Sequence, residues 1–173
     1  MSQKNNKIIF ISIGTRFVMD RLLEDADTVI KKYPCLKASA QIGPSSFQSG
    51  HIKATQWLDA FDFDRAVKMC DVFISHAGMG NILLAEKYNK PIIIMPRRTD
   101  LGEHTNDHQL ATADALQRSA FIHVVNNAQE LEQMLVNILE KPQEHSSQSH
   151  SNKINRENLI EALKGYLTEN ERV

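Results

Sequence analysis

Cysteines and long apolar runs are both scarce in this sequence of 173 residues. Its two cysteines, Cys35 and Cys70, are too few for a disulfide framework and predict reduced thiols, as in a cytoplasmic protein. No apolar stretch approaches the roughly 20 residues that span a bilayer. The opening residues MSQKNNK also lack the apolar segment of a signal peptide. We therefore expect a cytoplasmic protein, and if it works at a membrane, another component must bring it there.

A strong net charge is missing as well. The 20 Lys and Arg residues nearly balance the 21 Asp and Glu residues, and the formal net charge is −1. This balance gives no electrostatic reason to expect binding to nucleic acid or to an anionic membrane surface. Hydrophobic residues make up 42% of the chain, which is the composition of a soluble domain with a real core.

Several familiar catalytic and binding motifs are absent. The sequence contains no GxSxG elbow, no P-loop and no paired CxxC motif, which argues against the usual hydrolase, NTPase and zinc-ribbon classes. The glycine pair in Gly78-Met79-Gly80 is followed by Leu83 where a dinucleotide fingerprint needs a third glycine. NAD binding is therefore not expected.

What the sequence does contain is a regular alternation of short apolar runs and helical patterns. Apolar runs predict strands at residues 7–13, 37–42, 51–58, 72–75, 91–95 and 121–125. Apolar residues at helical spacing predict helices at residues 19–33, 63–69, 81–88, 106–118 and 127–140. This order predicts an α/β fold with a Rossmann-like, doubly wound parallel sheet.

The chain divides into a domain and a tail. Residues 1–140 form the predicted domain, residues 141–152 read as a polar linker of low complexity, and residues 153–173 read as an amphipathic helix. That helix packs either on its own domain or on another polypeptide, and the pattern alone leaves both alternatives open.

Two groups of residues follow predicted strands, at the sheet edge where α/β proteins bind ligands. The turn Gly78-Met79-Gly80 would let a phosphate approach backbone N–H groups at a helix N-terminus, although a tight turn without a ligand has the same sequence. Arg97 and Arg98 follow the 91–95 strand and suit a diphosphate, although an exposed basic pair is common.

The most polar cluster runs from Glu103 to Gln109. His104 and His108 are four residues apart, which suggests zinc, but the HExxH pattern would need glutamate where Thr105 stands. Hydrogen bonding to a polyhydroxyl ligand explains the Asn, Asp, His and Gln residues of this cluster better. We expect no metal site.

Taken together, these segments resemble a known family. The segment ISHAGMGNILLAEKYNKPIIIMPRR, followed by EHTNDHQLATA, resembles the donor-binding C-terminal domain of MurG-like glycosyltransferases of family 28, and FISIGTRFVMDRLL resembles its start. The resemblance covers about residues 7–140 and implies the C-terminal half of a GT-B glycosyltransferase. It is closest to split enzymes, such as two-subunit exopolysaccharide transferases and the dolichol-linked N-acetylglucosamine transferase, whose donor and acceptor domains are separate chains.

The resemblance also implies roles for individual residues. Gly78, Met79 and Gly80 would bind the diphosphate of a UDP-sugar, helped by Arg97 and Arg98. Glu86 would bind the ribose, and Phe61 or Phe63 would lie against the uracil. Gly14 and Thr15 would line the cleft that faces the acceptor half. The donor sugar would contact Asn106, Asp107, His108 and Gln109.

The implied reaction is direct glycosyl transfer, without a metal or another cofactor, to a lipid-linked acceptor held by a membrane-anchored, acceptor-binding partner subunit. His76, Glu103 and His104 are the candidates for the general base in this chain. Two alternatives compete with this hypothesis. The chain could be a non-catalytic stabilising subunit of such a transferase, or an enzyme of the nucleotide-sugar epimerase type.

Overall fold

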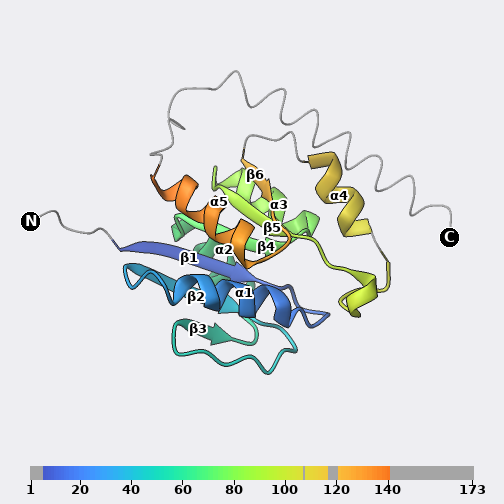
Figure 1. The fold of residues 1–173 in the computed structure, drawn as a ribbon, viewed down its shortest axis with the longest axis horizontal. Coiled ribbons are helices and arrows are strands. Elements are labelled where there is room, and N and C mark those ends of the chain that lie inside the picture. The colour runs from blue at the N-terminus through green and yellow to red at the C-terminus, as the bar shows by residue number, and fades with distance from the viewer. Residues whose placement is uncertain (1–5, 107, 117–120, 141–173) are drawn as a thin grey trace, which may run out of the picture.

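The computed structural model describes residues 6–106, 108–116 and 121–140. Its centre is a six-stranded parallel β-sheet with the strand order β3-β2-β1-β4-β5-β6. From β1 the chain adds β2 and β3 on one side, and then returns to add β4, β5 and β6 on the other side (Figure 1). This doubly wound arrangement confirms the predicted α/β, Rossmann-like fold.

The strands are short, and the central ones are almost fully buried. Because helices cover both faces of the sheet, β1, β4 and β5 are nearly continuous apolar runs. The register places Ser12 at the end of β1 opposite both Gln41 in β2 and Ser75 in β4. The six strands are β1 (Lys7–Ser12), β2 (Leu36–Gln41), β3 (Ile52–Thr55), β4 (Val72–His76), β5 (Ile92–Met95) and β6 (Ile122–Val124).

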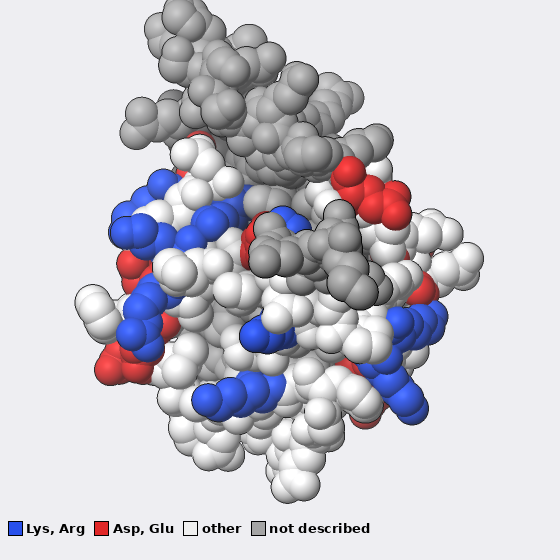
Figure 2. All heavy atoms as spheres, turned by 90° about the vertical axis from the view of Figure 1, so that its left-hand side faces the viewer, with Lys and Arg blue, Asp and Glu red and all other residues white. Residues whose placement is uncertain are grey.

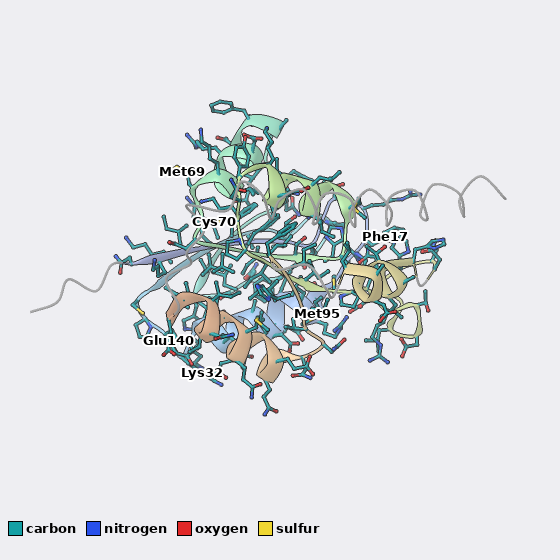
Figure 3. All side chains as sticks on the ribbon, turned by 90° about the horizontal axis from the view of Figure 1, so that it is seen from above. Phe17, Lys32, Met69, Cys70, Met95 and Glu140 are labelled. Atoms are coloured by element: carbon teal, nitrogen blue, oxygen red, sulfur yellow. The ribbon has the colours of Figure 1, made fainter. Side chains whose placement is uncertain are left out.

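Helices pack on both faces of the sheet. On one face, α1 (Asp20–Ile30) and α5 (Ala128–Glu140) bury their apolar stripes against the sheet in one hydrophobic core. On the other face, α2 (Ala60–Met69), α3 (Met79–Lys87) and α4 (His108–Leu116) share a second core with the sheet. Figure 3 shows Met69, at the end of α2, on one side of the sheet, and Lys32 and Glu140 on the other.

The sequence placed most elements correctly but misjudged some ends. Helix α2 begins at Ala60 rather than at residue 63, because the Asp59 carboxylate caps it by accepting the Asp62 backbone N–H at 2.7 Å. Helix α3 begins at Met79, two residues earlier than predicted. Strand β3 ends at Thr55 rather than at residue 58, and the 3₁₀ turn η1 (Thr99–Leu101) was not predicted. These differences lie at the end of the sheet where the strands finish, whereas α1 ends at Ile30 rather than at residue 33, at the opposite end.

The predicted linker at 141–152 and the tail helix at 153–173 lie outside the described residues. None of the helices within the described ranges has both the length and the apolar character needed to cross a membrane. Figure 2 shows the face of the molecule where the strands begin, and both Lys or Arg and Asp or Glu side chains are scattered over it. The ligand-sized cavity lies at the other end of the sheet, where the strands finish.

Candidate functional site

A cavity of about 670 Å³ opens where β1 and β4 end. Its walls come from the loop after β1, the N-terminal ends of α2 and α3, and the segment that leads from β5 into α4. Strands β1 and β4 are neighbours whose connections leave toward opposite sides of the sheet. In open α/β sheets this switch point is where ligands bind.

His76 lines the cavity between two glycines. A Cβ atom on Gly78 would come within 2.3 Å of the His76 Nε2 atom, and a Cβ on Gly14 would come within 3.0 Å of its Cε1 atom. Gly14 also has a φ of +83°, which side chains other than glycine rarely adopt. Both glycines therefore leave room for the imidazole ring between the two loops.

The surroundings of His76 keep its ring neutral. Burial lowers its pKa to about 4, and the nearby Arg97 guanidinium and His104 act in the same direction. The Ser12 carbonyl, 3.4 Å from His76 Nδ1, opposes this effect only in part. A neutral imidazole can donate or accept a hydrogen bond at neutral pH, but with this pKa it is a weak base.

The first turn of α3 faces the cavity with backbone groups. The N–H groups of Gly78 and Asn81 donate to the carbonyls of His76 at 2.7 Å and Gly78 at 3.0 Å, whereas those of Met79 and Gly80 have no backbone acceptor within the described residues. These two N–H groups lie at the positive end of the helix dipole. Gly80 lines the cavity, and a Cβ there would meet no heavy atom within 4 Å. Asn81 is fixed beside it, because its side-chain Nδ2 donates to Ser75 Oγ at 2.6 Å. This arrangement suits a phosphate group.

Arg97 holds the loop after β1 in place. It is 2% exposed, and its guanidinium donates to the carbonyls of Val18 at 3.0 Å, Phe17 at 2.9 Å and Glu103 at 2.9 Å, and also to Ile13. Arg97 therefore joins the β1–α1 loop to the segment after β5. Its five N–H donors are largely taken by protein carbonyls rather than left for a ligand.

Glu103 stabilises the same segment. It is 6% exposed, and its carboxylate accepts both Nε and Nη2 of Arg21 at 2.8 Å and the Arg98 backbone N–H at 2.9 Å. A bidentate pair of this kind is among the stronger ion pairs in proteins. Glu103 does not line the cavity, so its geometry supports a structural role rather than that of a general base.

The two ends of the cavity differ in chemistry. Toward β2 and α2, the lining side chains of Leu58, Ala60, Phe63 and Leu84 are apolar. The polar groups among them are the buried Gln41 and Asp64, whose carboxylate accepts the Tyr88 hydroxyl and the Lys87 ammonium group. Toward β5 and α4, the lining is polar. There Gln109 accepts the Arg97 backbone N–H at 3.1 Å, and the His104 ring lies 4.8 Å from the Phe17 ring. A ligand with a flat apolar end and a polyhydroxyl end matches this division.

Many of the site residues predicted from sequence meet in this cavity. Figure 3 shows Phe17, whose loop lines it, at the edge of the sheet near α4. The predicted residues that line the cavity are Gly14, Thr15, Phe63, His76, Gly78, Gly80, Arg97, His104 and Gln109.

Other predicted residues lie away from the cavity lining. Phe61 is 74% exposed, and Arg98 pairs with Asp100 on the surface. Asn106 accepts the His108 backbone N–H at 3.4 Å, just before α4. Asp107 lies outside the described residues. The described residues that do not line the cavity are Phe61, Met79, Glu86, Arg98, Glu103, Asn106 and His108.

Glu86 illustrates why helix register matters here. It follows Leu84 by two residues, and Leu84 lines the cavity whereas Glu86 does not. Residues two apart on a helix point in nearly opposite directions, because each residue turns the helix by about 100°. Glu86 thus lies outside the cavity lining, and its expected ribose contact stays a prediction.

Sequence reasoning missed half of the cavity lining. Arg16 and Phe17 follow the predicted turn at Gly14 and could have been found by extending that loop. Gln41 could have been found as the amide side chain at the end of a predicted strand. Asn81 could have been found because it directly follows the glycine turn. The missed lining residues are Ser12, Arg16, Phe17, Gln41, Leu58, Ala60, Asp64, Asn81 and Leu84.

Across residues 6–106, 108–116 and 121–140, no three His, Cys, Asp or Glu side chains are grouped in a way that could hold a metal ion. His76 and His104 both line the cavity, but no carboxylate or thiolate completes a metal-ligand set with them in these ranges. The lining is instead suited to hydrogen bonding.

The family model described as the glycosyltransferase family 28 C-terminal domain matches residues 8–163 of this chain. That match covers most of the 173 residues. No sequence among the curated proteins matches the chain.

Several solved structures share this fold. The glycotransferase of kitacinnamycin is 18% identical, with a TM-score of 0.65 over 94% of this chain and 39% of its own. MurG of Acinetobacter baumannii is 15% identical, with a TM-score of 0.59 over 80% of this chain and 42% of its own. MnaA of S. aureus, solved with UDP, is 16% identical, with a TM-score of 0.57 over 79% of this chain and 38% of its own. The chain thus spans about two fifths of each of these proteins.

Proposed function

Because this chain belongs to the glycosyltransferase family 28 C-terminal domain family, we propose that it is the donor-binding part of a nucleotide-sugar glycosyltransferase. The donor is a UDP-sugar. The observation that carries this proposal is the cavity at the ends of β1 and β4, where the glycine turn, the first turn of α3 and the neutral His76 meet.

The diphosphate lies against the first turn of α3. There the backbone N–H groups and the helix dipole favour a negative charge, and Gly80 leaves the space for a phosphate to approach. Arg16 also lines the cavity, and it takes part in no ion pair within the described residues. Its guanidinium, which lies 5.3 Å from the Phe17 ring centre, is the cation best placed to move onto the phosphates.

These groups act on the step in which the acceptor oxygen bonds to the anomeric carbon and the bond to the nucleoside diphosphate breaks. Negative charge then grows on the leaving phosphate, and donors already aimed at that position lower the barrier. His76 contributes a neutral hydrogen bond rather than a charge, because its pKa of about 4 leaves it unprotonated at neutral pH. His104 and Gln109 are placed to contact the sugar hydroxyls.

We further propose that a second polypeptide supplies the acceptor site and the general base. Two facts support this proposal. Glu103 is engaged with Arg21 outside the cavity, and the pKa of about 4 makes His76 a weak base. A membrane-anchored partner would present a lipid-linked acceptor to the open side of the cavity at the cytoplasmic face of the membrane.

The decisive experiment is calorimetric titration of the purified chain with UDP, GDP and UDP-sugars. We expect UDP and a UDP-sugar to bind and GDP to bind at least tenfold more weakly, because the apolar end of the cavity is bounded by Leu58 and Phe63. The absence of nucleotide binding by a folded chain would refute the donor site. Efficient glycosyl transfer by this chain alone would refute the need for a partner.

A further inference from the structure

Gln41, at the end of β2, is a buried amide with one group fixed and one group unused. It is 4% exposed, and it lines the apolar end of the cavity. Its Oε1 atom accepts the Leu58 backbone N–H at 3.0 Å. A backbone N–H can bond only to an acceptor, so this contact fixes which end of the amide is the oxygen. The Nε2 atom therefore points the other way.

The Nε2 group of Gln41 is open to the cavity. Within the described residues it donates to no protein atom, and it is not one of the side-chain atoms that the protein seals from solvent. Gln41 is otherwise enclosed, so the space it reaches is the cavity that it lines. Buried polar groups in proteins normally have a hydrogen-bond partner. A donor held open in a cavity is thus prepared for an acceptor on a ligand.

The position of Gln41 indicates which part of the ligand this is. The neighbouring lining residues Leu58, Ala60 and Phe63 are apolar and suit a flat base, whereas the glycine turn of the phosphate site lies on β4 and α3. In the register of the sheet, Ser12 of β1 is the partner of Gln41 on one side and of Ser75 of β4 on the other. The amide is therefore on the base side of the cavity, separated from the phosphate side by the width of β1.

We propose that Gln41 selects the nucleobase by donating a hydrogen bond from Nε2 to the O4 carbonyl oxygen of uracil. This inference rests on the proposed donor site and adds the residue that reads the base. Cytosine carries an amino group where uracil has its O4 carbonyl. That amino group is itself a donor, so it could form no hydrogen bond with Gln41 Nε2, and both N–H groups would be left without an acceptor. Gln41 thus favours UDP over CDP.

The test variant removes the hydrogen-bond donor of Gln41, its Nε2 group, and keeps the oxygen that accepts the Leu58 N–H. In Gln41→Glu, a carboxylate oxygen can still accept the Leu58 N–H, whereas the second oxygen can no longer donate when ionised. Calorimetric titrations at pH 8 compare UDP with CDP. We expect the unaltered chain to bind UDP at least tenfold more tightly than CDP. We expect the variant to lose about tenfold in UDP affinity and to retain less than a threefold preference for UDP.

Gln109→Glu is the matched control, because Gln109 also lines the cavity and also accepts a backbone N–H, that of Arg97. Because Gln109 lies at the sugar end of the cavity, Gln109→Glu should leave the ratio of UDP to CDP affinity unchanged. A test on the ligand side needs no variant at all. UDP with sulfur in place of O4 offers a weaker acceptor, and it should bind the unaltered chain several-fold more weakly than UDP.

The outcomes separate the two proposals. If the unaltered chain binds neither UDP nor CDP, the proposed donor site fails and the role of Gln41 fails with it. If it binds UDP but folded Gln41→Glu keeps the full preference over CDP, the donor site stands and Gln41 is not the reader. Equal binding of UDP and its 4-thio analogue would also overturn the role of Gln41, even if the variant did not fold.

Discussion

The fold itself does not require a glycine at position 80. A Cβ there would meet no heavy atom within 4 Å, and glycine within a helix is less favourable than alanine by up to about 1 kcal/mol. We expect Gly80→Ala to raise the free energy of unfolding by about 0.5 kcal/mol in urea titrations. The same change should weaken UDP binding at least tenfold in calorimetry, because the methyl group lies where the phosphate approaches α3.

Gly50 provides the matched control, because a Cβ there also meets nothing within 4 Å and the residue does not line the cavity. Gly50→Ala should leave UDP affinity unchanged. Gly78→Ala should instead destabilise the protein, since its methyl group would collide with His76. An unaltered UDP affinity in Gly80→Ala would place the phosphates elsewhere.

His76 links the stability of the protein to pH. Its pKa is about 4 in the folded chain and about 6.5 in an unfolded chain. The unfolded state therefore binds more protons between these values, and stability falls as the pH is lowered from about 6.5 toward 4. Linkage predicts that His76 costs the protein about 2 kcal/mol of stability by pH 5 relative to pH 7.

His76→Gln isolates this contribution, because glutamine does not titrate. In urea unfolding at pH 7 and pH 5, we expect the unaltered chain to lose about 2 kcal/mol more than the variant, with all other groups contributing equally to both. Equal losses would show that His76 titrates normally in the folded protein. The ring would then be more open to solvent than the two flanking glycines indicate.

At the scale of structural elements, the adjacent residues Arg97 and Arg98 differ in role, because Arg97 is buried and connects two loops whereas Arg98 lies on the surface. Arg97 donates to four backbone carbonyls in two loops, whereas Arg98 is half exposed and pairs with Asp100. We expect Arg97→Met to lower the free energy of unfolding by at least about 3 kcal/mol, because buried carbonyls lose a charged donor. Arg98→Met should leave the urea midpoint unchanged, because exposed ion pairs contribute little.

Nucleotide binding should follow the same division. Arg97→Lys keeps the charge but not the planar fork that reaches several carbonyls. We expect the folded fraction of this variant to bind UDP more weakly than the Arg98→Met protein does, because the β1–α1 loop loses its attachment to the segment after β5. Identical UDP affinities in calorimetry would mean that the loop holds its shape without Arg97.

The sequence identified the elements more reliably than their ends or their contacts. The apolar runs of β1, β4 and β5 and the stripes of α1 and α5 follow from burial on the two faces of the sheet, so their periodicity was sufficient. The start of α2 depends on a single cap at Asp59, and η1 depends on the path of the chain around Arg97 and Glu103. Such local contacts carry no periodic signal.

The same limit applies to the site. His76 and the glycines were found because a strand followed by a glycine turn places them at the sheet edge. The structural role of Glu103 depends on Arg21, which is 82 residues away in sequence, and the orientation of Glu86 depends on where α3 begins. Pairings between distant segments are set by the whole fold, so the contact between Glu103 and Arg21 could not be read from a local pattern.

For the molecule as a whole, the two ends of the sheet should respond differently to ligand. The cavity lies at the ends of β1 and β4, and Arg97 ties both of its flanking loops together. We expect saturating UDP to slow amide hydrogen exchange in residues 13–18, 78–82 and 97–104. Amides near residues 31–36, where α1 ends and β2 begins, should be unaffected. The comparison is confined to amides that exchange by local opening, because ligand binding slows global unfolding everywhere. Protection that was equal at both ends of the sheet would show that UDP acts on overall stability without occupying this cavity.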